Sequence, residues 1–374
     1  MMPTINSKII SILRFPLTFL VVVIHSRGEV THVSDWSHLT MADVCSLVKV
    51  FLSDGVAQIA VPTFFFISGY LFFYQLEKLD LSTYKRKLKS RFHTLFVPFV
   101  LWNLLCIPLT MLVFYGESLG GTSLPTKAVD YWNNIPWGHI FWDYTSHHAE
   151  YPNLLGMPLL LNGPVLGTFW YVRDLILIVL LSPVFYWFLK RTGKYGAMLL
   201  LLLLCFRVWP YMTLRVQCLY FVLGGYWSMN KHNLYIENKV LRKLNYLLTV
   251  GLLLFLTAVG SYEHFWGFQL ITLYALSGMA TAFCLAHKLL QHRPDFRFPK
   301  ILNDSSFFVY ALHIEFSLPL AFFVVKAVFK HLPADLLLFQ YLLVPVVIYA
   351  ISVGAYWLMQ KLTPGFLRLL TGNR

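Results

Sequence analysis

The sequence predicts an all-α integral membrane protein with about ten transmembrane helices and both termini in the cytoplasm. Hydrophobic residues fill 57% of the 374 positions and charged residues only 13%, whereas a soluble domain carries about 25% charged residues. Apolar stretches long enough to cross a bilayer recur along the whole chain. Lysine and arginine concentrate in alternate segments between these stretches. We therefore expect residues 1–374 to form a single transmembrane domain.

Ten apolar stretches define the expected spans. The fifth and sixth are short and close together, which predicts a tight hairpin. The last two contain Pro319 and Pro345, which membrane helices tolerate. We find no internal repeat, which disfavours a transporter built from repeats. The expected spans are residues 8–26, 51–74, 92–115, 167–189, 195–210, 213–229, 245–262, 267–290, 304–328 and 336–360.

The placement of positive charge predicts the orientation of these spans. With the N-terminus in the cytoplasm, 22 of the 30 Lys and Arg residues and 5 of the 17 Asp and Glu residues fall on the cytoplasmic side. That side then carries a net charge of +17 and the outer side −4, as the positive-inside rule requires. Because every basic cluster lies at the end of an expected helix, we expect contacts with membrane lipid and no nucleic-acid binding.

Residues 116–166 form the one long loop of the expected topology, on the extracytoplasmic side. Long loops within a domain are often functional, and the aromatic residues Tyr131, Trp132 and Trp137 favour an ordered lid that presents flat faces to a sugar. Four potential metal ligands in the loop lack a recognised spacing, so we expect no metal site: His139, Asp143, His147 and His148.

The first span contains the ionisable residues Arg14 and His25, and such residues are costly inside a membrane. They are eleven positions apart, which places them on one helix face about 16.5 Å apart. An anchor at each interface is one interpretation. A functional alternative is that the guanidinium holds a phosphate at the cytoplasmic end and the imidazole takes a proton from a hydroxyl. An acyl-CoA, with phosphates far from its thioester, has the shape to meet both.

The third span is preceded by a dense basic segment, residues 84–91. Two interpretations remain open for it, an anchor to anionic lipid headgroups and a clamp for the phosphates of CoA. The candidate donor-binding residues of this segment are Arg86, Lys87, Lys89 and Arg91.

Further polar residues mark a possible pocket. Ser68 and Gly69 are small enough to allow close helix packing. A nucleophilic Ser68 is the alternative, which the absence of a Gly-x-Ser-x-Gly elbow disfavours. Arg173 and Asp174 are adjacent and point about 100° apart on a helix, so we expect each to pair with another helix, in a structural contact or at the acceptor. A polar stripe in the ninth span indicates either a cavity wall or a hydrogen-bonded seam; its members are Ser306, Tyr310, His313 and Ser317.

Five segments together resemble the membrane-bound acyltransferase 3 family, whose members O-acylate carbohydrates. The resemblance implies that His25 is the catalytic histidine and that Arg14 binds the CoA side of the donor. The family often has Arg-x-x-Arg at the entry to the third span, and this chain departs from it with Arg86-x-x-Lys89. The segments are Arg14-x10-His25, Pro62–Tyr70 (PTFFFISGY), Arg91–Asn103, Phe169–Asp174 (FWYVRD) and Tyr310–His313 (YALH).

The expected function is transfer of an acetyl or other acyl group from cytoplasmic acetyl-CoA to a hydroxyl of an extracytoplasmic carbohydrate or glycan. His25 would act as general base, with an acyl-histidine intermediate as the alternative route. We expect a multi-pass protein of the bacterial inner membrane. The competing hypothesis is a transporter or flippase for a sugar or lipid-linked sugar. The expected pocket residues besides the donor site are Ser68, Tyr171, Arg173, Asp174, Tyr310 and His313.

Overall fold

The computed structural model describes residues 5–30, 37–119, 125–144, 163–206, 213–259, 267–329 and 336–373. Within these ranges every regular element is a helix and none is a strand, which confirms the predicted all-α class. The α-helices are α1 (Ile5–His25), α2 (Met41–Lys49), α3 (Ala60–Phe73), α4 (Leu81–Arg91), α5 (Val97–Leu119), α6 (Pro125–Asn133), α7 (Trp170–Leu180), α8 (Ser182–Phe206), α9 (Thr213–Met229), α10 (Lys239–Val259), α11 (Gly267–His292), α12 (Lys300–Asp304), α13 (Ser306–Leu312), α14 (Leu318–Phe329), α15 (Leu337–Leu362) and α16 (Pro364–Thr371).

Short π- and 3₁₀-helical segments interrupt or join these helices. The π-helical ones matter for the site, because a π-turn shifts the phase of the residues that follow it. The segments are η1 (Val50–Gly55), η2 (Val56–Ile59), η3 (Phe92–Phe96), η4 (Trp137–His139), η6 (Gly167–Phe169) and η7 (His313–Ser317).

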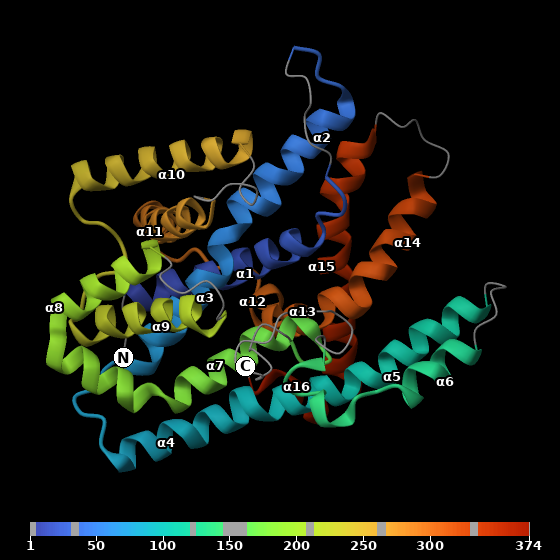
Figure 1. Cartoon of the computed structure of the whole chain (residues 1–374), viewed down its shortest axis with the longest axis horizontal. Helices are drawn as coiled ribbons and strands as arrows, with labels where there is room; N and C mark the ends of the chain where they lie inside the picture. Colours follow the sequence, from blue (N-terminus) through green and yellow to red (C-terminus); the bar gives the residue numbers. More distant parts are fainter. Residues whose placement is uncertain are drawn as a thin grey trace.

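The helix α1 crosses the middle of the molecule (Figure 1). The helices α3 and α13 pack against α1, and α9 packs closely on α3. Below them, α4 continues through η3 into α5 along one edge, and α10 and α11 lie together on the opposite edge. Asp80 starts α4, where its carboxylate accepts a hydrogen bond from the Thr83 N–H at 2.8 Å. Hydrogen bonds from Thr83 and Ser82 hold the pKa of Asp80 below its usual value.

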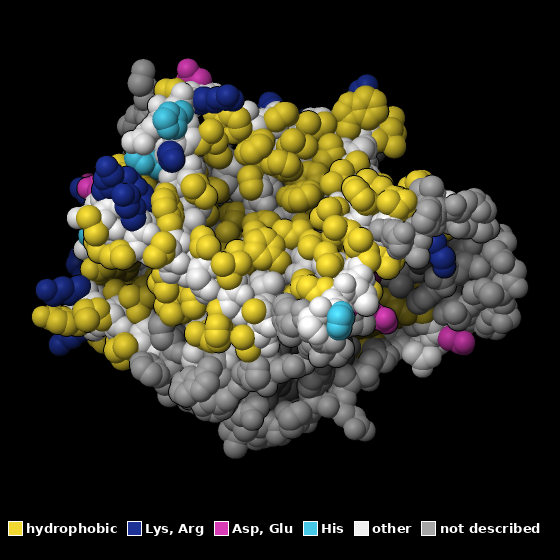
Figure 2. Space-filling view, turned by 90° about the horizontal axis from the view of Figure 1, so that it is seen from above, with side chains coloured by type: hydrophobic (Ala, Val, Ile, Leu, Met, Phe, Trp, Pro, Cys, Tyr) yellow, Lys and Arg dark blue, Asp and Glu magenta, His cyan; other side chains and the backbone are white. Residues whose placement is uncertain are grey.

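Seven helices of the described chain are long and apolar enough to cross a membrane. They match seven of the expected spans: Ile5–His25, Met41–Phe73, Leu81–Leu112, Lys239–Val259, Gln269–His292, Ser306–Phe329 and Leu337–Leu362. Large hydrophobic side chains are exposed along several of them, among them Leu244, Leu247 and Leu254 of α10. Figure 2 shows such side chains spread over one face, with Lys and Arg gathered mainly at its left. An apolar surface of this extent fits contact with lipid.

The other three expected spans take a different form. The fourth and fifth fall on Gly167–Leu180 and Ser182–Leu203, which are bent by 60° relative to each other. Gly193 interrupts α8 again at φ 55°, a conformation that favours glycine. The sixth falls on α9, which has 17 residues, so the number of ten spans stays a prediction. Of the expected loop 116–166, residues 120–124 and 145–162 lie outside the described residues, and residues 116–119 belong to α5.

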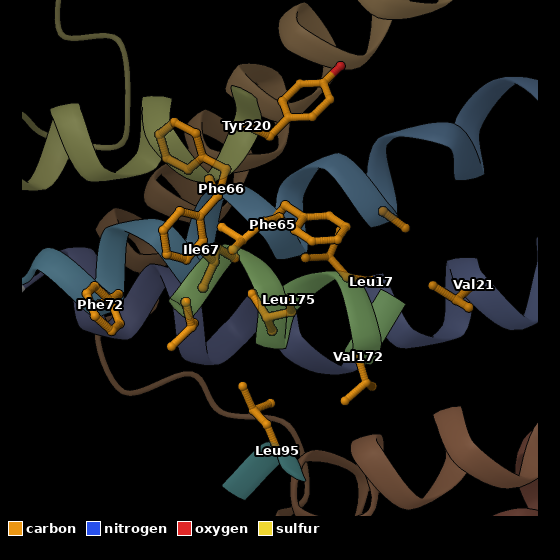
Figure 3. Close-up of a cluster of buried hydrophobic side chains, with 14 of the residues drawn as sticks. Leu17, Val21, Phe65, Phe66, Ile67, Phe72, Leu95, Val172, Leu175 and Tyr220 are labelled. Carbon is orange, nitrogen blue, oxygen red and sulfur yellow. The ribbon is translucent and has the colours of Figure 1, made fainter. Parts of the chain in front are cut away.

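The central core is apolar and joins α1, α3 and α7. Figure 3 shows Leu17, Phe65 and Leu175 converging from these three helices, and all three side chains are buried. A side chain at Gly69 would collide with the Phe221 carbonyl, so Gly69 lets α3 and α9 touch backbone to backbone. The packing interpretation of Ser68-Gly69 is therefore confirmed for Gly69.

Candidate active site

A cavity of about 370 Å³ lies among α1, α3, η3, α7 and α13. One stripe of α1 supplies a side of its wall at helical spacings of four, four, three and four residues. Apolar side chains cover most of the remaining wall. In such a cavity the few polar groups determine which ligand binds and how it is oriented. The members of the α1 stripe are Ile10, Arg14, Thr18, Val21 and His25.

Arg14 and His25 line this same cavity at different depths, as the helix-face argument predicts. Both side chains are accessible from the cavity. Arg91, at the end of α4, adds a second guanidinium to the wall. Within the described residues neither arginine forms an ion pair with a carboxylate. Two unpaired cations in a mostly apolar cavity favour binding of an anion.

The other basic residues of α4 lie outside the cavity wall. Arg86 and Lys89 are exposed, and Lys87 donates a hydrogen bond of 2.5 Å to the Phe72 carbonyl while lying over the Phe72 ring. Consecutive helix positions point in different directions, so only one side of α4 can face the cavity. Of the four candidates in this segment, the structure brings Arg91 alone together with Arg14.

Hydroxyl groups converge on the wall opposite α1. The hydroxyls of Ser68 and Tyr171 are 3.5 Å apart, and the rings of Tyr171 and Tyr310 meet edge to face with centroids 5.9 Å apart. The Tyr310 hydroxyl donates a hydrogen bond to the Thr168 carbonyl. Three of the expected pocket residues, Ser68, Tyr171 and Tyr310, thus line the same cavity as His25. Because the Tyr310 hydroxyl already donates to Thr168, Ser68 and Tyr171 are the ones that can offer a donor to a ligand.

His313 lies against His25, with ring centroids 5.1 Å apart. Its side chain is buried, and its Nδ1 lies 2.6 Å from the Tyr310 carbonyl. A carbonyl only accepts hydrogen bonds, so Nδ1 carries the proton and Nε2 is left as an acceptor. That Nε2 atom is buried and has no partner in the described part of the chain. With its proton on Nδ1, His313 is neutral and can accept a hydrogen bond at Nε2 from a neighbouring group.

The polar stripe of the ninth expected span divides into two parts. Ser306 and Tyr310 line the cavity, whereas the Ser317 hydroxyl lies 2.7 Å from that of Ser352 on α15. The π-helical turn η7 begins at His313 and shifts the face that follows. Ser306 and Tyr310 thus form cavity wall and Ser317 forms a hydrogen-bonded seam, whereas His313 lies behind His25 and is not part of the cavity wall.

The expectation that Arg173 and Asp174 pair with other helices is wrong. The guanidinium of Arg173 contacts the Asp174 carboxylate at 2.9 and 3.0 Å. Both side chains are buried, and an unpaired buried charge is so costly that the long arginine side chain folds back to its neighbour. Arg173 also donates to the Trp142 carbonyl at 2.5 Å. The pair fixes residues 137–142 against α7 and does not line the cavity.

Five polar residues of the wall were not predicted from the sequence: Thr18, Thr94, Thr168, Asn303 and Asp304. Asn303 and Asp304 line the cavity beside α1. Asn303 precedes Ser306 and Tyr310 at spacings of three and four, so extending the polar stripe backwards by one turn would have found it.

No group of three or more His, Cys, Asp or Glu side chains that could hold a metal occurs in the described residues. His139 and Asp143 contact each other at 2.7 Å. His147 and His148 lie outside the described residues.

Apolar helices long enough to cross a membrane surround a cavity whose wall contains Arg14, Arg91 and His25, which is the arrangement of a membrane protein with a polar site between its helices. The chain belongs to the acyltransferase 3 family, whose profile, described as an acyltransferase domain, matches residues 8–360. It is a multi-pass membrane protein that catalyses O-acyl transfer. The family assignment thus favours the enzyme over the transporter.

The chain is also similar to the succinoglycan biosynthesis protein ExoH of Rhizobium meliloti (strain 1021). The two are 26% identical over 348 residues, which cover 87% of this chain and 82% of that protein. No solved structure matches the chain significantly.

Proposed function

We propose that this enzyme transfers an acetyl or related acyl group from cytoplasmic acyl-CoA to a hydroxyl of an extracytoplasmic polysaccharide, with His25 as general base. The observation that carries this proposal is the shared wall of Arg14 and His25 in one cavity. Arg14 precedes His25 by about 16.5 Å along the helix, so one elongated donor can contact both. The similarity to a succinoglycan biosynthesis protein supports a polysaccharide acceptor.

The donor end of the cavity suits the phosphates of CoA. Arg14 and Arg91 are fixed cations that can each offer two N–H groups to phosphate oxygens. Both line the wall and neither is neutralised by a carboxylate in the described chain. Arg86, Lys87 and Lys89 add positive charge from outside that wall, where the lipid-anchor role fits their exposure or backbone contact.

At the other end, His25 takes the proton of the acceptor hydroxyl while that oxygen attacks the thioester carbonyl carbon. The carbon–sulfur bond then breaks, and the proton held by His25 passes to the departing CoA sulfur. The His313 ring lies against the His25 ring, and its Nε2 atom, which has no partner among the described residues, is available to accept a hydrogen bond from His25 and so to orient the base during transfer. The hydroxyls of Tyr171 and Ser68 share the cavity wall with His25 and are the candidate donors for the oxyanion. Direct transfer needs no covalent enzyme intermediate.

The topology of this proposal has the N-terminus in the cytoplasm of a bacterium and the chain in the inner membrane. The gathering of Lys and Arg towards one side of the molecule supports this orientation (Figure 2). The similarity to a protein of the bacterium Rhizobium meliloti supports a bacterial origin for this enzyme. With this orientation Arg14 faces the compartment that contains acyl-CoA.

The test is transfer of labelled acetyl from acetyl-CoA to carbohydrate in inside-out membrane vesicles. His25→Ala should lower the rate by about 10²–10⁴-fold, the usual contribution of a general base. His292→Ala is the matched control, because His292 is exposed at the end of α11, and it should transfer at the wild-type rate. Wild-type transfer by His25→Ala would refute the proposed role.

A further inference from the structure

A second cavity, of about 260 Å³, lies at the start of α1. Its wall is formed by Ser7, Lys8 and Ser11 of α1 and by residues 294–298, which join α11 to α12. Asn303 lies in the walls of both cavities, so the two are neighbours. The proposed function gives this second cavity no role.

One face of α1 runs from the second cavity to the catalytic histidine. Ser7 and His25 are eighteen positions apart, which is about five helical turns and about 27 Å, and so places them on the same side of a straight helix. Arg14 lies on this face between them. A single elongated ligand along α1 would therefore meet the second cavity, then Arg14, then His25.

The second cavity carries positive charge that the protein does not neutralise. The Lys8 ammonium donates one hydrogen bond, of 3.2 Å, to the Pro294 carbonyl, and the exposed Arg297 belongs to the same wall. No ion pair joins either residue to a carboxylate within the described ranges. Both cations therefore have N–H groups that can donate to a ligand, which suits the dianion of a phosphate monoester.

The cavity also has features for the rest of a nucleotide. The Asn303 Oδ1 atom is buried and has no partner among the described residues, and such an atom costs free energy until a donor reaches it. The rings of Phe296 and Phe298 lie in the wall with centroids 5.2 Å apart. Aromatic faces are surfaces on which bases stack, and an N–H group of the ligand would satisfy Asn303.

We propose that the second cavity binds the adenosine end of the CoA donor, with Lys8 and Arg297 on the ribose 3′-phosphate. This inference rests on the proposed function, because it assigns the far end of the same donor. Arg14 and Arg91 then hold the pyrophosphate. The competing place for the 3′-phosphate is the basic segment of α4, whose Arg86 lines neither cavity.

The test compares acetyl-CoA with acetyl-dephospho-CoA, which lacks only the 3′-phosphate. The wild-type KM should be about tenfold lower for acetyl-CoA, the size of one charge-assisted contact. Lys8→Gln and Arg297→Gln should raise the KM for acetyl-CoA alone and so remove the preference. Arg297→Lys, which keeps the charge, should retain part of it. Lys243→Gln removes an exposed cation of α10 that lines neither cavity and should keep the full preference.

Three outcomes would overturn the assignment. The first is a wild-type preference that survives in both Lys8→Gln and Arg297→Gln. The second is a preference that Arg86→Gln removes, since the 3′-phosphate would then lie at α4. The third is a wild-type enzyme with equal KM values for the two donors.

A binding measurement separates this assignment from the proposed function. The thermal shift of the purified protein with CoA should exceed that with dephospho-CoA, and Lys8→Gln should abolish the difference. Such a result in a protein that transfers no acetyl group would keep the nucleotide site and reject the proposed transfer. Equal shifts in an enzyme that does transfer acetyl would reject the nucleotide site alone.

Discussion

The helices α1 and α10 have the same length, but α1 lies in the interior of the protein and α10 at its surface. Each has 21 residues, and α1 has the higher mean hydropathy, 2.0 against 1.5. Yet half of the most apolar window of α1 is buried inside the protein, compared with 11% for α10. The more hydrophobic helix is thus the interior one, and the less hydrophobic one exposes leucines such as Leu247, 74% exposed.

The difference lies in where the polar groups point. Arg14 and His25 of α1 face the cavity, whereas Asn245 of α10 donates hydrogen bonds to the Ser277 carbonyl and the Thr281 hydroxyl of α11. A polar group without a protein partner inside a membrane helix indicates a ligand, and one with a partner indicates helix pairing. Mean hydropathy predicts that both helices span the membrane, and only the direction of these groups separates their roles.

Substitution of Arg14 should have the largest effect, because Arg14 lines the cavity and no carboxylate of the described chain forms an ion pair with it. Arg14→Gln should raise the KM for acetyl-CoA by about tenfold to a hundredfold, since a charge-assisted hydrogen bond contributes about 1.5–3 kcal/mol. The kcat should change little, because the contact persists from ground state to transition state. Steady-state kinetics in inside-out vesicles measure both constants.

Arg14→Lys provides the control, because it keeps the charge and loses the planar pair of donors. Its KM should fall between those of the wild type and Arg14→Gln. An unchanged KM in Arg14→Gln would mean that the face of α1 carries no donor contact, and the contrast with α10 would fail.

Substitution of His313, whose ring lies against that of His25, tests the outer end of the α1 face that lines the cavity. His313→Phe should lower kcat about tenfold, because it removes the Nε2 acceptor that we propose orients His25, and the KM for acetyl-CoA should stay near the wild-type value. His313→Gln retains an acceptor oxygen near the position of Nε2 and should recover part of kcat. A merely structural role for His313 predicts no such recovery, so equal losses of kcat in both variants would contradict the positioning role.

Composition and periodicity predict the features of this structure that depend on one segment of the chain at a time. They predict the helical class, the seven matching spans and the shared face of Arg14 and His25. The bend between α7 and α8 also has a local cause in the sequence, because Pro183 has no N–H to donate to the carbonyl four residues before it. Pro183 therefore lies in the first turn of α8, and the helix is interrupted just before it, at Leu181.

The remaining features depend on packing between distant segments. Which basic residue of α4 faces the cavity depends on how α4 lies against α1 and α7, and no local pattern separates Arg91 from Arg86. The contact of His25 with His313 joins opposite ends of the chain. The fold-back of Arg173 onto Asp174 is a response to burial, which the 100° rule for neighbouring residues does not include.

Substitution of Asn245 tests whether the polar group of α10 serves only to pair α10 with α11, and it has the smallest expected effect. Asn245→Leu removes the hydrogen bonds to α11 but keeps the apolar surface, so it should lower the free energy of unfolding by about 1 kcal/mol and leave the KM for acetyl-CoA unchanged. Thermal unfolding in detergent measures the first quantity and vesicle kinetics the second. Leu247→Ala is the control, because an exposed position should alter stability by less than about 0.5 kcal/mol. A raised KM in Asn245→Leu would show that α10 supports the donor site, since loosening one helix pair alone leaves the cavity wall of α1 intact.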